Sequence, residues 1–360
     1  MSRSVTIVGA GIFGASLAYR LARDGWGVRL YERHEPGHPG AASGGESRLI
    51  RYAHGTGDWY TRSAWRAREL WRELERETGR ELLVETGIAW FARSEDGWEA
   101  ESERVLRAEG IPVERLNPDA GQELFPSFDP QNVAFILWEP NAGVLRAAEA
   151  TKATVEAAER AGAELQHEVA EPGAVEDDVV VWACGAWLRE LFGLPVRVTK
   201  QDTLYFAAAG WTCPPVPAWV DYSNAIYGHG DLDELGVKVA PDQEGPAFDP
   251  ERGARVVSPE TEHAARTYLA QRFPALRDTP IDHGSVCQYA VTTDTNFVLA
   301  PHPERTDEWI FGGGSGHGFK HGPALAEYAA SVVSGEREPE PQFGLGPRDH
   351  GPSLRTAGTA

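Results

Sequence analysis

The chain begins with a succession of apolar and amphipathic segments. Residues 5–8 are an apolar run, residues 12–24 place apolar side chains at helical spacing, and residues 28–31 form a second apolar run. A tight glycine turn separates the first run from the amphipathic stretch. Short apolar runs bounded by glycine are typical of buried strands, and a 3.6-residue apolar period is typical of a helix. We therefore expect a βαβ unit at the start of the chain.

Similar patterns divide the rest of the chain. Helical periodicity predicts helices at residues 58–80, 96–110, 147–165, 259–273 and after a glycine turn at 312–318. Apolar or alternating runs predict strands within residues 87–94, 132–140, 176–187, 202–209, 224–229, 236–241 and 308–314. We expect Trp65 and Trp71 to be packing residues of the first of these helices. The run at 176–187, which contains Cys184, reads as a buried strand that returns to the sheet of the βαβ unit.

The order of these elements predicts an α/β protein. We expect a Rossmann-type domain and a second domain, an α+β layer built on a mainly antiparallel sheet. The first domain is predicted to be discontinuous, with residues 1–85, 141–197 and 283–335. The second takes residues 86–140 and 198–282. Residues 336–360 are rich in proline, glycine and charge and predict a partly disordered surface tail.

Composition narrows the possible partners and compartment. A formal net charge of −20 disfavours nucleic acid and anionic membranes, and no run of eighteen apolar residues could span a bilayer. The N-terminal segment lacks the basic region of a signal peptide. The three cysteines, Cys184, Cys213 and Cys287, have neither metal-ligand spacing nor an even disulfide count. We expect a cytoplasmic protein without a metal site.

A glycine motif lies at the turn of the βαβ unit. Gly9, Gly11 and Gly14 form G-x-G-x-x-G between the predicted strand and helix, and Glu32 follows the second strand. In this motif glycines allow the tight turn and the close approach of a pyrophosphate, while the acid binds ribose hydroxyls. The sequence therefore predicts a dinucleotide site.

Two further stretches carry candidate chemistry. Arg48 and Arg51 are three residues apart in "SGGESRLIRYAHG", a spacing that puts two side chains on one face of a helix. Such a pair is more often a solvated or salt-bridged pair, but its place near the nucleotide motif favours function. Residues 312–320, "GGGSGHGFK", contain five glycines between a predicted strand and helix. Backbone this open lets amides approach a planar or anionic ligand.

Taken in order behind the glycine motif, "SGGESRLIRYAHG", "GVKVAP", "CQY", "TTDTNFVLAPHP" and "GGGSGHGFKHGP" resemble one enzyme family. This is the monomeric sarcosine oxidase and N-methyltryptophan oxidase group of the D-amino-acid-oxidase-like flavoenzymes. The resemblance reaches to about Gly335 and implies FAD as the dinucleotide.

The resemblance also implies a role for one cysteine. In that group the cysteine of C-x-Y is joined to the 8α-methyl of the flavin, which makes Cys287 the expected link; the alternative is a buried free thiol. A thiolate is a competent nucleophile for such a bond, and nearby basic groups favour the thiolate. The resemblance implies that FAD is bound by Gly9, Gly11, Gly14, Glu32, Arg33, Ser43, Arg48, Cys287, Gly314, Gly316, Gly318 and Lys320.

The family pattern assigns further residues to the substrate. Arg51 and Lys320 match the pair that binds the substrate carboxylate, a role suited to fixed cations. Tyr289 and Tyr227 match tyrosines that line the substrate pocket.

Three residues match positions close to the reacting centre. Arg48 and Lys238 match basic residues at the flavin faces, and the lysine is the one associated with oxygen activation. Asp242 is a departure, because sarcosine oxidases carry a histidine there, close to the substrate amine. A carboxylate at this position favours a cationic amine, although the reacting amine must be neutral. The sequence leaves open whether Asp242 faces the substrate or solvent.

The resemblance implies a monomeric amine oxidase. Its substrate would be a small amine that bears a carboxylate, such as an N-methyl amino acid, and O2 would be reduced to hydrogen peroxide. Asp242 keeps open a second interpretation, an oxidase or dehydrogenase of the same fold that acts on a different amine or a cyclic amino acid. A non-catalytic flavin-binding protein is a third, and the retained cations argue against it.

Overall fold

The computed structural model describes residues 3–348, and these form three β-sheets with helices packed around them. The first sheet has six strands and is parallel except for the pair β16 and β17. In spatial order its strands are β16 (Val298–Pro301), β17 (Glu308–Gly312), β10 (Val179–Trp182), β1 (Ser4–Val8), β2 (Gly27–Tyr31) and β9 (Glu164–Gln166). The strand at 176–187 returns to this sheet, as predicted, because β10 pairs directly with β1.

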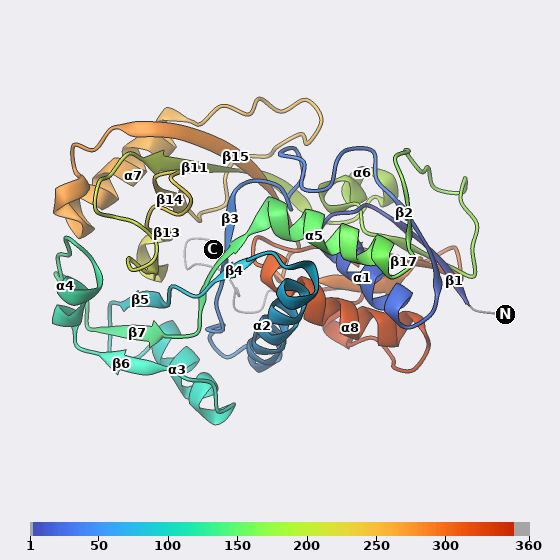
Figure 1. The fold of residues 1–360 in the computed structure, drawn as a ribbon, viewed down its shortest axis with the longest axis horizontal. Coiled ribbons are helices and arrows are strands. Elements are labelled where there is room, and N and C mark those ends of the chain that lie inside the picture. The colour runs from blue at the N-terminus through green and yellow to red at the C-terminus, as the bar shows by residue number, and fades with distance from the viewer. Residues whose placement is uncertain (1–2, 349–360) are drawn as a thin grey trace.

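Long helices cover the six-stranded sheet, on the right of Figure 1. α1 (Ile12–Arg23) packs against α5 (Ala147–Arg160) and α8 (Gly322–Val333), and α2 (Asp58–Thr78) packs on α8. Most of α1 is buried, including Leu17 and Leu21. Trp71 of α2 is fully buried, which confirms its packing role, and Trp65 is partly buried against the same core.

The second sheet has eight strands within the described residues and is antiparallel except where β12 meets β5. In spatial order the strands are β15 (Ile281–Val291), β11 (Arg197–Phe206), β14 (Val237–Pro241), β13 (Ile226–His229), β12 (Ala218–Asp221), β5 (Ile88–Ala92), β7 (Phe135–Glu139) and β6 (Glu114–Leu116). α3 (Trp98–Ala108) contacts β5 and β7, and α7 (Pro259–Arg272) contacts β14 and β11. Two short helices are α4 (Gly121–Leu124) and α6 (Leu188–Phe192).

A small sheet holds the basic stretch in place. Its strands are β3 (Ser47–Ile50), β8 (Gly143–Arg146) and β4 (Leu83–Val84), with β8 in the middle. Arg48 lies in β3 and Arg51 directly follows it, so the expectation that both share one face of a helix is wrong. Pairing with β8, almost a hundred residues away in sequence, imposes the extended conformation.

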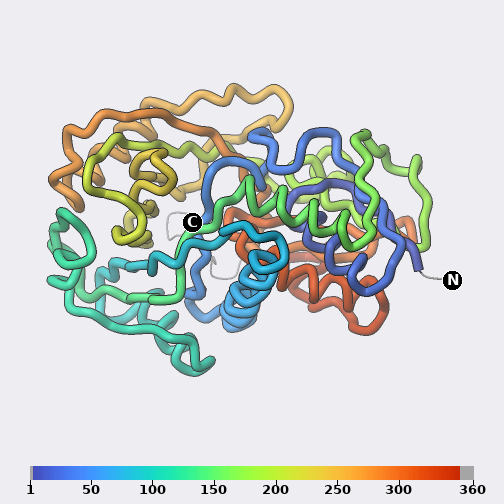
Figure 2. The backbone as a smooth tube through the Cα atoms, in the orientation of Figure 1, coloured from blue at the N-terminus to red at the C-terminus, as the bar shows by residue number. Residues whose placement is uncertain are grey.

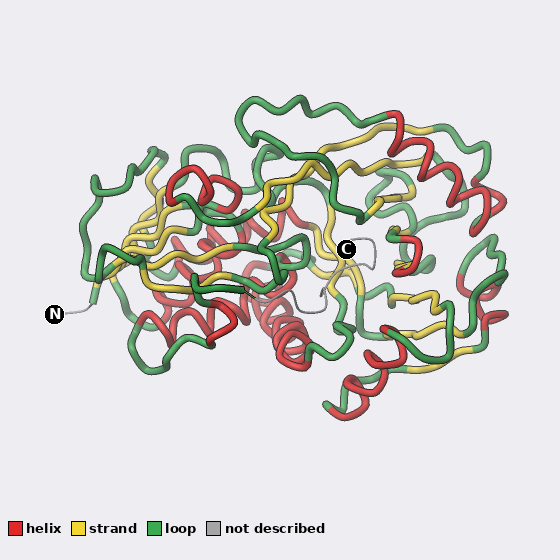
Figure 3. Tube along the Cα trace, turned by 180° about the vertical axis from the view of Figure 1, so that it is seen from behind, coloured by secondary structure: helices red, strands yellow, loops and turns green. Residues whose placement is uncertain are grey.

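Both halves of the molecule combine segments that are far apart in the chain. Figure 2 shows N-terminal and C-terminal segments side by side around the six-stranded sheet, and Figure 3 shows strands in both halves from behind. The α/β fold with a mainly antiparallel second sheet is as predicted. The division into domains stays a prediction, and its boundary at residue 283 falls inside β15, a strand of the eight-stranded sheet.

Two local expectations need correction. Cys184 lies after the end of β10, not within it, because the chain turns at Gly185. The predicted surface tail is packed in its described part: Phe343 is fully buried beside Trp59, and Arg348 pairs with Asp294 at 2.8 Å. Residues 349–360 of that predicted tail lie outside the described residues.

Candidate functional site

The glycine motif forms the tight turn that a dinucleotide requires. Gly9 has φ of +103°, and a Cβ placed on it would lie 2.6 Å from the carbonyl oxygen of Ala183. A Cβ on Gly14 would lie 1.9 Å from the carbonyl oxygen of Gly9, so α1 packs on β1 more closely than any side chain would allow. Both positions therefore require glycine, because neighbouring backbone comes too close to leave room for a side chain.

The neighbouring polar residues are held by backbone groups of the same turn. The Glu32 carboxylate accepts hydrogen bonds from Ala10 N at 2.9 Å and His34 N at 3.0 Å. Ser43 Oγ accepts from Ile12 N at 2.9 Å, which satisfies an amide at the start of α1. Arg33 lies over the ring of Trp187 and pairs with Glu251.

One continuous cavity connects this turn to the predicted substrate residues. Its wall includes the glycine motif, residues of β3 and β15, and the 312–320 loop. Predicted site residues on the wall are Gly9, Gly11, Glu32, Arg33, Ser43, Arg48, Arg51, Tyr227, Asp242, Tyr289, Gly314, Gly316, Gly318 and Lys320. Gly14, Cys287 and Lys238 lie behind this wall, Gly14 against Gly9 and the other two beside Arg48.

Arg48 is the residue around which the centre of the cavity is organised. Its guanidinium donates to the carbonyl oxygens of Ser47, Ala42 and Gly44 at 2.7 to 3.0 Å and to Cys287 Sγ at 3.1 Å. This contact places a fixed positive charge against the Cys287 thiol. Burial raises the pKa of Cys184 and of Cys213 to about 12, so neither of these thiols is suited to nucleophilic chemistry.

Lys238 lies at the end of a closed chain of hydrogen bonds, the Lys238 network. Its Nζ donates to the Ser47 carbonyl oxygen at 3.0 Å and to Ser47 Oγ at 2.9 Å. Ser47 Oγ in turn lies 2.8 Å from His229 Nε2, and His229 Nδ1 lies 2.7 Å from the carbonyl oxygen of Gly230. Burial, with the charge of Arg48, lowers the pKa of Lys238 to about 7. Sequence reasoning missed Ser47 and His229, which lie inside the basic stretch and the predicted strand 224–229 but carry no spacing signal.

Arg51 and Lys320 bring two basic side chains to the cavity wall. Lys320 is buried in the turn Phe319–His321, and its Nζ donates to the His317 carbonyl oxygen at 2.8 Å. Burial and the charge of Arg51 lower the pKa of Lys320 well below its ordinary value. The Arg51 guanidinium lies 5.4 Å from the ring centroid of Trp90 and donates to the carbonyl oxygen of Ala53.

A buried carboxylate that the sequence did not reveal supports Arg51. Glu139, at the end of β7, accepts hydrogen bonds from Tyr52 N at 2.8 Å, Ala53 N at 3.2 Å and Trp90 Nε1 at 2.6 Å. Burial raises the pKa of this carboxyl group. Glu139 therefore fixes the backbone that follows Arg51.

Asp242 lines the cavity, and its role towards the substrate stays a prediction. Tyr289 Oη donates to Asp242 Oδ1 at 3.3 Å, and Tyr227 lines the same wall. Burial, followed by the charge of Asp242, raises the pKa of Tyr227 to about 12. The Tyr227 hydroxyl is therefore protonated at neutral pH.

A family model described as FAD dependent oxidoreductase matches residues 4–332. The chain belongs to this family. Its dependence on FAD follows, and the predicted resemblance to the sarcosine oxidase group is confirmed. The geometry of the glycine turn and of Glu32 fits the nucleotide part of FAD.

Named members of the FAD dependent oxidoreductase family match along most of the chain. Monomeric sarcosine oxidase of Bacillus sp. (strain B-0618) is 30% identical, with 91% of this chain and 91% of that protein covered. N-methyl-L-tryptophan oxidase of Yersinia pestis (strain Pestoides F) is 24% identical, with 94% and 97% covered. The crystal structure of L-proline dehydrogenase from P. horikoshii has a TM-score of 0.82 at 22% identity, covers 96% and 97%, and confirms the fold.

Near Arg51 and Lys320 lies a group of three histidines. His54, His317 and His321 are buried and lie with one ring nitrogen of each within 4.8 Å of the others. We call them the histidine cluster. Burial lowers the pKa of His54 and of His321 well below the usual value.

Proposed function

We propose that this member of the FAD dependent oxidoreductase family is an amine oxidase that oxidises the C–N bond of a secondary amine bearing a carboxylate, or of an N-methyl amino acid. The observation that supports this most is the single cavity that joins the glycine turn to the cation pair Arg51 and Lys320. Similarity to monomeric sarcosine oxidase along the chain supports the same substrate class.

The cofactor would be held by the residues of the glycine turn and the 312–320 loop. Gly9, Gly11 and the N-terminus of α1 would face the pyrophosphate, and Glu32 the ribose. When bound, FAD supplies the redox chemistry: it takes two electrons and a proton from the amine and passes electrons to O2, which gives hydrogen peroxide. The imine product is hydrolysed by water.

Arg51 and Lys320 would bind and orient the substrate carboxylate. Both line the cavity, and an Arg fork combined with a Lys point charge suits a carboxylate. Tyr289 and Asp242, hydrogen bonded to each other on the same wall, would lie nearer the amine. A Tyr289 hydroxyl that donates to Asp242 reduces the pull of this carboxylate on a proton of the amine.

Lys238 and Arg48 would act on oxygen. Both are fixed by carbonyl oxygens of the β3 segment, so their positive charge is pre-organised. The low pKa of Lys238 lets it hold or release a proton near neutral pH.

We further propose that Cys287 carries FAD covalently. The support is its contact with Arg48 and the weak acidity of the other two thiols. Acid precipitation tests this: yellow colour in the pellet, lost in Cys287→Ala, is expected. Yellow colour in the supernatant of the wild-type protein would make Cys287 a packing thiol.

Asp242 favours one alternative, an oxidase or dehydrogenase of the same fold for a different amine or a cyclic amino acid. A carboxylate on the cavity wall can accept from an additional donor of the substrate. Matched turnover tests with O2 and with an artificial electron acceptor separate the oxidase from the dehydrogenase.

Compartment and assembly state are also proposals. Among the described residues no helix is both long enough and apolar enough to cross a bilayer. The three cysteines are unpaired with one another, which suits the cytoplasm. A monomer is proposed from the resemblance to monomeric sarcosine oxidases.

A panel of amines tests the proposed activity. Purified holoenzyme is incubated with N-methyl amino acids, cyclic amino acids and matched amines without a carboxylate, and hydrogen peroxide is measured. We expect peroxide only with carboxylate-bearing substrates, and a much higher KM in Lys320→Met. Equal rates for substrates with and without a carboxylate would contradict the proposal.

A further inference from the structure

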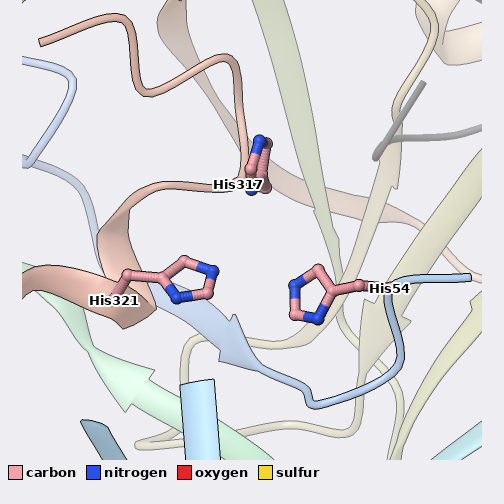
Figure 4. A group of neighbouring side chains, drawn as sticks. All are labelled: His54, His317 and His321. Atoms are coloured by element: carbon pink, nitrogen blue, oxygen red, sulfur yellow. The ribbon is translucent and has the colours of Figure 1, made fainter. Parts of the chain in front are cut away.

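The histidine cluster comes from two distant parts of the chain. His54 follows the β3 segment, whereas His317 and His321 flank Lys320 near the start of α8. Figure 4 shows the His54 and His321 rings directed toward one another, with His317 beside them. Ring centroids are 5.4 Å apart for His54 and His321, 6.3 Å for His54 and His317, and 6.0 Å for His317 and His321.

Hydrogen bonds on the outer side of the cluster set the tautomers. His54 Nδ1 lies 2.9 Å from the Tyr52 carbonyl oxygen, and His317 Nε2 lies 2.9 Å from the Thr295 carbonyl oxygen. A carbonyl only accepts, so each of these nitrogens carries the proton and the other ring nitrogen carries a lone pair. His321 Nδ1 lies 3.0 Å from Ser63 Oγ, which can accept its proton in the same way.

Lone-pair nitrogens are thereby directed inward. His54 Nε2 and His321 Nε2 are buried and have no hydrogen-bond partner among the described residues. Leaving a buried polar atom without a hydrogen-bond partner is destabilising. Two such atoms that face one another require an electrophile or a hydrogen-bond donor between them.

We propose that the histidine cluster is a binding site for a divalent transition-metal ion of the zinc class, held by the three imidazoles. Neutral imidazoles whose outer nitrogen donates to a carbonyl or hydroxyl are the usual second-shell arrangement of such ligands. Zinc–nitrogen bonds of about 2.0 Å in a tetrahedral geometry place ring centroids roughly 5 Å apart. All three ring pairs are farther apart than this, so the rings must move closer on binding, His54 and His317 the most because they are 6.3 Å apart.

The charges near the histidine cluster favour an anionic fourth ligand on the proposed metal ion. Arg51 and Lys320 lie close enough to affect the histidines electrostatically, and their positive charge opposes a bare cation. An anionic fourth ligand, hydroxide or a carboxylate, offsets this charge. His317 also lines the cavity, so the open position would face the substrate end.

A metal here would fix the two segments that carry the carboxylate-binding cations. His54 is three residues from Arg51, and His317 and His321 bracket Lys320. The inference does not rest on the proposed substrate, because metal binding is measured without amine or oxygen turnover.

Zinc content is the first test. Tag-free holoenzyme is freed of metal with a chelator, given Zn²⁺ alone, passed through gel filtration and analysed for zinc and flavin. We expect about one zinc per chain and, by X-ray absorption, three imidazole nitrogens at about 2.0 Å. Absence of retained zinc, or a sulfur or all-oxygen shell, would overturn the site and leave the cluster as a water-binding pocket.

Matched variants locate the bound ion. His54→Phe and His321→Phe remove one ligand each without adding a buried polar atom, and both should lose stoichiometric zinc. His263→Ala removes an exposed histidine of α7 and should keep it. The flavin spectrum and melting temperature report whether each variant folds. Zinc retained equally by all three would overturn the site, and if the Phe variants fail to fold, the X-ray absorption of wild-type protein still decides.

Discussion

Two buried polar regions, the Lys238 network and the histidine cluster, differ in how they satisfy their hydrogen bonds. In the Lys238 network every link has a partner, from Lys238 through Ser47 and His229 to a backbone carbonyl. In the histidine cluster, two inward nitrogens have none among the described residues. A closed network fixes one charge in one place, whereas an open cluster retains capacity for a ligand. We therefore expect the Lys238 network to affect the reaction with oxygen and the histidine cluster to affect the binding of the substrate.

Removing the charge of the closed network should have the largest effect. Lys238→Met deletes a pre-organised cation, and loss of one such group typically costs 100- to 1,000-fold in rate. We expect the reoxidation of reduced enzyme by O2 to slow by roughly this factor, with amine oxidation under anaerobic conditions little changed. Stopped-flow absorbance of the flavin measures both steps, and an unchanged reoxidation rate would remove Lys238 from the oxygen reaction.

The cation pair beside the cluster should show the opposite pattern. Arg51→Lys keeps the charge but loses the planar fork, and a hydrogen bond to a charged group is worth about 1.5–3 kcal/mol. We expect KM for a carboxylate-bearing amine to rise roughly 10- to 100-fold and the O2 step to stay unchanged. Steady-state kinetics at saturating O2 test the first expectation. A change confined to the O2 step would reverse the proposed division.

The pH dependence should follow Lys238. Its folded-state pKa of about 7 is below the ordinary 10.5, so the folded protein loses this proton as pH rises through 7. A rate that needs the cation should be highest below pH 7 and fall about tenfold per pH unit well above it.

Stability should change in the other direction. Between pH 7 and about 10.5 the unfolded chain keeps the proton that the folded chain has lost, so this group increases the free energy of unfolding as pH rises.

A variant tests the pH dependence of the rate. Lys238→Arg does not titrate in this range, so it should flatten the pH profile of the rate. A wild-type profile that is flat from pH 6 to 9 would contradict the assignment of Lys238.

His229 should have a smaller effect because it acts through Ser47. His229→Phe removes the acceptor of the Ser47 hydroxyl, and a neutral hydrogen bond is worth about 0.5–1.5 kcal/mol. We expect a roughly three- to tenfold slower O2 step, partly restored in His229→Asn, whose amide oxygen can accept. Equal rates in the Phe and Asn variants would indicate a packing role.

A surface lysine gives the smallest expected effect and sets the scale. Lys152 pairs with Glu149 at 3.2 Å, and both side chains are about half exposed. Exposed ion pairs contribute roughly 0–1 kcal/mol to stability. Lys152→Ala should therefore lower the free energy of unfolding by less than about 1 kcal/mol and leave the rates of amine oxidation and flavin reoxidation unchanged. Chemical denaturation measures the change in unfolding free energy. A large loss of stability in Lys152→Ala would mean that burial does not distinguish Lys238 and Lys320 from Lys152.

Local patterns in the sequence predicted the parts of the fold that depend on neighbours in the chain. The glycine turn and α1 follow from the spacing of Gly9, Gly11 and Gly14, and β10 follows from an unbroken apolar run. The strand around Arg48 was not predictable because β8 imposes it from a distance. Cys184 was misplaced because the apolar run does not reveal where Gly185 turns the chain.

The polar regions required the three-dimensional structure. Ser47 and His229 are 182 residues apart, and no spacing rule relates them. The histidine cluster joins His54 with His317 and His321. Metal-binding motifs in sequence depend on short spacings between ligands, so a motif search does not find this group. Phe343 was assigned to a surface tail because a lone apolar residue in a polar stretch gives no period.

The order of assembly of the cavity has a consequence for biosynthesis. The glycine turn is made first, but β15 with Cys287, β17 and the 312–320 loop all come after residue 280. Synthesis proceeds from the N-terminus, so a nascent chain of 280 residues has most of the residues that line the cavity but lacks those of β15, β17 and the 312–320 loop. We therefore expect FAD to be captured only after residues 281–320 have been synthesised.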